Sequence, residues 1–97
     1  MPYTADRSRG AVKIMSLTLE ANLELAFSNL RLAEAETSGG KAAHATELIT
    51  KAILAHRSVL QELACIPDSY EGKRDLTAEA TRLLEAIQFV ERRFRAL

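Results

Sequence analysis

Apolar side chains recur every three or four residues over most of the chain, and this spacing predicts three long α-helices. The pattern covers residues 16–37, 41–64 and 75–97. Because an α-helix has 3.6 residues per turn, such spacing places the apolar side chains on one face. Residues 1–14 lack this periodicity, so we expect a mobile segment there, followed by a single domain over residues 15–97.

The breaks between these segments predict how the helices are connected. Gly39 and Gly40 separate the first two segments, and Pro67 and Gly72 separate the second from the third. Glycine readily takes the left-handed conformation that ends a helix, and proline interrupts one. Short connections make consecutive helices antiparallel neighbours. We therefore expect an all-α, antiparallel up-down-up three-helix bundle, with dimerisation into a larger helical bundle as an open alternative.

Each predicted helix has an apolar face that we expect to form the core. The three sets are Leu19, Leu23, Ala26, Phe27, Leu30 and Ala33; Ala45, Leu48, Ile49, Ala52, Val59, Leu60 and Leu63; and Leu76, Ala80, Leu83, Ile87, Val90, Phe94 and Leu97.

The first helix also carries apolar residues on its opposite side, namely Ile14, Ala21, Leu25 and Leu32, with Leu17 beside them. A helix of an isolated three-helix bundle normally has a polar back, so a second apolar strip indicates either internal packing or a contact with another chain. Leu54 is a further apolar residue on the polar arc of the second helix. The favoured interpretation is an interaction surface formed by Leu17, Ala21, Leu25, Leu32 and Leu54.

The charge balance limits the possible partners, and the cysteine content bears on the cellular compartment. Thirteen basic residues balance thirteen acidic ones, and the chain has no tryptophan. A net charge of zero provides no long-range attraction to nucleic acid or an anionic membrane, so neither is expected as a partner. Cys65 is the single cysteine and the N-terminus lacks an apolar leader, which favours the cytoplasm.

The two histidines do not have the spacing of a metal site. Helical ligand pairs sit three or four residues apart, whereas His44 and His56 are separated by twelve residues, about 120° around a helix and about 18 Å along it. We expect no metal, cofactor or small-molecule substrate and no catalytic residue. His44 is expected to form a surface ion pair near Glu34.

His56 has two further interpretations. The stretch "LAHRSVLQEL", residues 54–63, resembles histidine phosphotransfer domains, which are helical bundles with a phosphate-accepting histidine. The lysine that follows this histidine in that family is replaced here by Val59. The helical pattern instead places His56 on the apolar face, which predicts a core histidine in polar contact with Asn22.

The hairpin "LRLAEAETSGGKAAHATELITKAI", residues 30–53, resembles the helix pairs of tetratricopeptide repeats and of microtubule-interacting-and-transport domains. Ala45, Ile49 and Ala52 match the small-large-small spacing of their second helix. This resemblance supports the topology alone. The layout is also similar to that of flagellar export chaperones, which are short helical bundles.

The apolar strip of the first helix provides the main functional hypothesis. We expect a non-enzymatic protein–protein interaction module, either an adaptor or a self-associating scaffold, with a homodimer favoured. The alternatives are a histidine phosphotransfer-like signalling domain and a small chaperone that holds an amphipathic client helix between its own helices.

Overall fold

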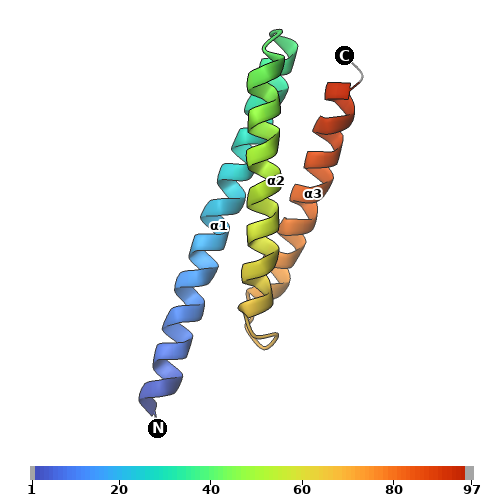
Figure 1. Cartoon of the computed structure of the whole chain (residues 1–97). Helices are drawn as coiled ribbons and strands as arrows, with labels where there is room; N and C mark the ends of the chain where they lie inside the picture. Colours follow the sequence, from blue (N-terminus) through green and yellow to red (C-terminus); the bar gives the residue numbers. More distant parts are fainter. Residues whose placement is uncertain (1, 96–97) are drawn as a thin grey trace.

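A computed structural model describes the backbone of residues 2–95 and the side chains of residues 10–95. It contains three helices, α1 (Pro2–Ser38), α2 (Ala42–Cys65) and α3 (Lys73–Arg95). α1 and α3 run in one direction, α2 runs in the other, and each helix contacts the other two (Figure 1). The expected all-α, antiparallel up-down-up three-helix bundle is confirmed.

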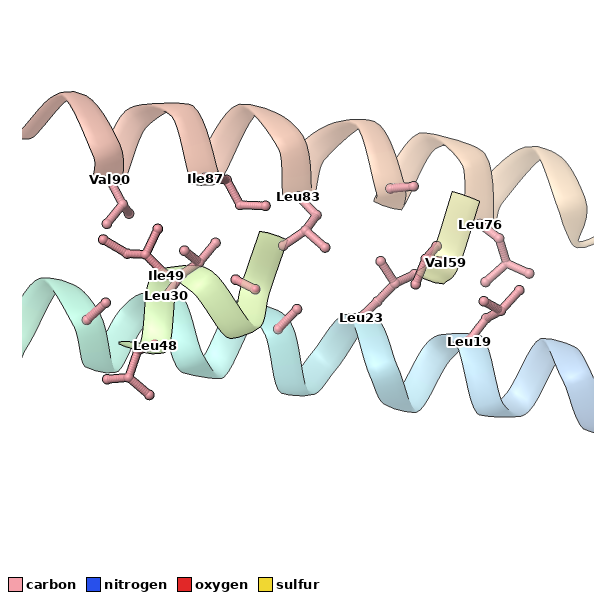
Figure 2. Close-up of a cluster of buried hydrophobic side chains, with 14 of the residues drawn as sticks. Leu19, Leu23, Leu30, Leu48, Ile49, Val59, Leu76, Leu83, Ile87 and Val90 are labelled. Carbon is pink, nitrogen blue, oxygen red and sulfur yellow. The ribbon is translucent and has the colours of Figure 1, made fainter. Parts of the chain in front are cut away.

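Except for Ile66, which follows α2, the buried apolar side chains come from the predicted face of each helix and meet between the three helices (Figure 2). Phe27 and Phe94 are half-buried and pack against this core. Leu60 is exposed, so its assignment to the core was wrong, and Leu97 lies outside the described residues. The buried apolar residues are Leu19, Leu23, Ala26, Leu30, Ala33, Ala45, Leu48, Ile49, Ala52, Val59, Leu63, Ile66, Leu76, Ala80, Leu83, Ile87 and Val90.

Small side chains lie where α1 and α2 pack together. Ala26 and Ala33 of α1, and Ala45 and Ala52 of α2, have no exposed surface. Because alanine adds only a methyl group to the helix surface, two helices with facing alanines can approach closely. The resemblance of residues 30–53 to a helix hairpin rests partly on two of these alanines.

α1 begins at Pro2, fourteen residues before the predicted start at Ser16, so the predicted start of the first helix was wrong, whereas the mobility expected for residues 1–14 stays a prediction. Proline is well tolerated in the first turn of a helix, and Gly10 lowers helix stability by only about 1 kcal/mol relative to alanine. The 37 residues of α1 extend about 55 Å, whereas the 24 of α2 extend about 36 Å. The N-terminal part of α1 therefore projects beyond the α2–α3 connection (Figure 1).

The turn between α1 and α2 is closed by a Schellman motif. The Lys41 amide donates to the carbonyl oxygen of Glu36 at 2.8 Å, and the Gly40 amide donates to that of Thr37 at 3.2 Å. Gly40 has a φ of 81°, a left-handed conformation that glycine adopts without steric cost. This turn reverses the chain within three residues and sets α2 beside α1.

The connection between α2 and α3 is held by Lys73, the first residue of α3. Its Nζ donates to the carbonyl oxygen of Ile66 and to Oδ1 of Asp68, both at 2.7 Å. The hydrogen bond from Lys73, followed by its charge, holds the pKa of Asp68 below its ordinary value of 3.8. This contribution to stability is present above pH 3.8 and is lost as the pH falls through the lowered pKa.

Candidate interaction surface

The second apolar strip of α1 is exposed to solvent. Ile14, Leu17, Leu25 and Leu32 expose 68%, 56%, 62% and 45% of their surface. The strip lies across α1 from the buried face that includes Leu19, Leu23 and Leu30, so it faces away from α2 and α3. Internal packing, the alternative drawn from the sequence, is therefore wrong.

The exposed back of α1 has the seven-residue repeat of a coiled-coil seam. We define the α1 seam as Ala11, Ile14, Thr18, Ala21, Leu25, Ser28, Leu32 and Ala35, all of which are exposed. In heptad notation Thr18, Leu25 and Leu32 occupy a positions, while Ala21 and Ser28 occupy d positions. The Thr18 hydroxyl donates to the carbonyl oxygen of Ile14 at 3.0 Å, which satisfies its polar group within the helix.

The sequence prediction identified only part of this seam. Ile14, Ala21, Leu25 and Leu32 belong to it, and Leu17 lies at its edge on the α3 side. Small and hydroxyl-bearing members were missed because a search for large apolar residues passes over them. The heptad spacing from Leu25 to Leu32, extended in both directions, is the signal that identifies them.

Charged residues are distributed unevenly along the groove between α1 and α3. Four carboxylates line the end near the α2–α3 connection, namely Glu20, Glu24, Asp75 and Glu79. Arginines line the other half together with two glutamates, namely Arg31, Arg82, Arg92, Glu34 and Glu85. The side of the α1 seam that borders α3 is therefore acidic at one end and has a net positive lining at the other.

Leu54 is exposed, at 53%, but it does not adjoin the α1 seam. It lies across α2 from buried Ala52, Val59 and Leu63 and so points away from the common core. When three helices surround one core, their backs point in different directions. The prediction that Leu54 contributes to one surface with Leu25 and Leu32 was therefore wrong.

His56 and Asn22 are both half-buried, and no direct hydrogen bond joins them among residues 10–95. His56 is therefore not part of the fully buried core, as was predicted for it, and its predicted polar contact with Asn22 is not a direct hydrogen bond; a contact through a water stays a prediction. Asn22 lies on the α2 side of α1, the side on which Glu36 contacts α2. His56 follows Ile49 by seven residues and therefore shares the side of α2 that borders α3.

His44 is turned toward α1. Its Nδ1 lies 3.5 Å from Oε1 of Glu36, and Nζ of Lys41 lies 3.7 Å from the other oxygen of the same carboxylate. The carboxylate nearest His44 is therefore that of Glu36 and not that of Glu34, which lies 3.4 Å from Arg93. Surface pairs of this kind contribute about 0–1 kcal/mol to stability.

Within the described part of the chain no helix has the length and apolar character needed to cross a membrane. Residues 10–95 contain no cluster of three or more potential metal-ligating side chains. Comparisons with protein-family models, with curated proteins and with solved structures found no match to this chain.

Proposed function

We infer that this protein is a non-enzymatic protein–protein interaction module that acts by self-association through the α1 seam. The observation that carries this proposal is the exposure of Leu25 and Leu32, seven residues apart on a helix whose other face is already buried. Isolated exposed leucines are common on protein surfaces, whereas exposed leucines that repeat with heptad spacing, with small residues between them, are typical of helices that pair.

The total surface area supports the same proposal. The chain exposes 6827 Å², compared with about 5,500 Å² for a typical folded monomer of 10.7 kDa. Its extents of 59 × 17 × 15 Å describe a long rod with a large side surface. A second chain along residues 15–38 of α1 would cover part of this side surface.

The charge balance favours a second copy as the partner. With thirteen basic and thirteen acidic residues, two copies carry no net charge and do not repel each other at long range. A strongly charged partner, by contrast, would not be attracted at long range by a chain of zero net charge. The phosphotransfer alternative gains no support, because His44 is held against Glu36 and His56 is half-buried toward α3.

The thermal unfolding midpoint tests this proposal. Dimerisation stabilises the folded chain by mass action, so the midpoint should rise with protein concentration. Each tenfold increase adds about 0.7 kcal/mol per chain, or about 3–5 °C for a domain of this size. The measurement is far-UV circular dichroism over a hundredfold concentration range, and a midpoint that stays constant throughout would contradict self-association.

A further inference from the structure

We propose that two copies pair antiparallel along the α1 seam in a single defined register; this rests on the proposed self-association and specifies its geometry. In this register Leu25 of one copy faces Ser28 of the other, and Leu32 faces Ala21. Thr18 faces Ala35 of the second copy. The two-fold axis passes between the levels of residues 26 and 27, and residues 15–38 of the two helices overlap over about 36 Å.

The sizes of the seam residues favour this register. Each layer that contains Leu25 or Leu32 pairs one large side chain with one small one, so the separation of the two helices stays even along their length. A parallel pair would place Leu25 on Leu25 and Leu32 on Leu32, with Ala21 on Ala21 and Ser28 on Ser28 between them. Thick layers would then alternate with thin ones, and the thin layers would leave gaps.

The charges beside the seam favour the same register. Glu24 and Arg31 lie on the α3 side of the seam, seven residues apart, and neither forms an ion pair among residues 10–95. In the proposed dimer Glu24 of each copy lies about 3 Å along the helix axis from the level of Arg31 of the other, on the same side of the seam. The two-fold axis also sets the acidic end of each α1–α3 groove against the arginine-lined end of the other.

Other arrangements of the same seam lose this complementarity. Shifting the antiparallel pair by one heptad, so that Leu25 faces Ala21, brings Glu24 against Glu24 at the axis. A parallel pair places acidic groove ends side by side and directs Arg31 toward Glu36 of the second copy. Glu36 is already engaged by Lys41 and His44 of its own chain. Like charges at such positions disfavour pairing.

The test exchanges the two charges in the full chain, under reducing conditions because Cys65 is exposed. E24R places arginine against arginine, and R31E places glutamate against glutamate, so each variant alone should dimerise about tenfold more weakly than the wild type. An equimolar mixture of the two should recover the dimer, because each chain then meets its complement at both positions. The doubly exchanged chain, E24R/R31E, should also recover it. Sedimentation velocity measures all four samples.

Arg57→Glu is the control, because it makes the same charge change as R31E at an exposed position of α2. It should dimerise as the wild type does, and circular dichroism should give the same helix content for every variant. A wild-type dimer whose E24R and R31E chains do not complement each other on mixing would overturn the antiparallel register while leaving self-association intact. A wild type that is monomeric would overturn both.

Discussion

Replacing both Leu25 and Leu32 with glutamate is expected to abolish self-association and leave a folded monomer. In the proposed dimer each new carboxylate would be desolvated against a small side chain of the other copy, with no cation opposite. A buried charge without a partner costs several kcal/mol, and the dimer would contain four of them. The dissociation constant should therefore rise by at least about a thousandfold.

The same double variant should not unfold the single chain. Leu25 and Leu32 are already largely in contact with water, and glutamate is a good helix former. Sedimentation velocity and circular dichroism, measured on one sample, separate loss of the dimer from loss of the fold. Leu54→Glu is the matched control, because it introduces the same charge at an equally exposed leucine on another face. If the double variant loses its helix content, or if Leu54→Glu dissociates the protein equally well, the assignment of the α1 seam as the contact surface fails.

Replacing Leu83 with alanine is expected to lower the free energy of unfolding by about 2–5 kcal/mol. Leu83 has no exposed surface and lies near the middle of the core between α1 and α3 (Figure 2). Removing its isobutyl group leaves a cavity that the surrounding helices fill only partly. A domain of this size has a total stability of about 5–15 kcal/mol, so the loss is a large share of it.

Urea unfolding at one fixed protein concentration measures this change, because dimerisation makes stability depend on concentration. Leu84→Ala is the control, since it removes the same group from the adjacent residue, which is 39% exposed. It should cost about 1 kcal/mol or less. Equal losses for the two variants would show that Leu83 is not a core residue.

The number of helices, their order and most of the core could be predicted from the spacing of apolar residues. Val59 and Leu83 are fully buried as the pattern predicts. A residue at the centre of an apolar face points into the core however the neighbouring helices pack against that face. Leu60 was misplaced because it lies at the edge of its face. There the exact packing of α3 decides whether a side chain is covered, and the spacing of one helix does not contain that information.

The N-terminal extension of α1 was missed for a different reason. Periodicity detects a helix that buries one face, and residues 2–10 have no such pattern. A helix that is already formed can nevertheless be extended at little cost, because each added residue gains a hydrogen bond without a new nucleation step. Prediction of the boundary therefore stopped where the apolar face stopped, at Ser16.

The absence of a direct hydrogen bond between Asn22 and His56 among residues 10–95 has a geometric cause. The turn at Gly39 and Gly40 fixes which residues of α1 and α2 lie at the same level along the bundle. Asn22 and His56 do lie at about the same level. The turn does not reveal on which side of α2 the third helix packs. His44 contacts α1, and His56, about 120° further around α2, shares the side of α2 on which Ile49 borders α3.

The α1 seam was predicted in part, and the sequence left its role open. Leu25 and Leu32 stand out by their spacing, but a second apolar face can equally be covered from within a fold. Only the arrangement of all three helices shows that nothing in the described chain covers these residues. The unequal charges of the α1–α3 groove likewise depend on residues of α3, such as Asp75 and Arg92, whose position beside α1 the spacing does not give.

Sedimentation equilibrium of the wild-type chain tests the central claim most directly. The measurement should run under reducing conditions from about 1 µM to about 1 mM, a range that detects association free energies of about −8 to −4 kcal/mol. Self-association through the α1 seam predicts an average mass that rises toward twice the chain mass of 10.7 kDa. An average mass that remains at 10.7 kDa over the whole range would contradict it.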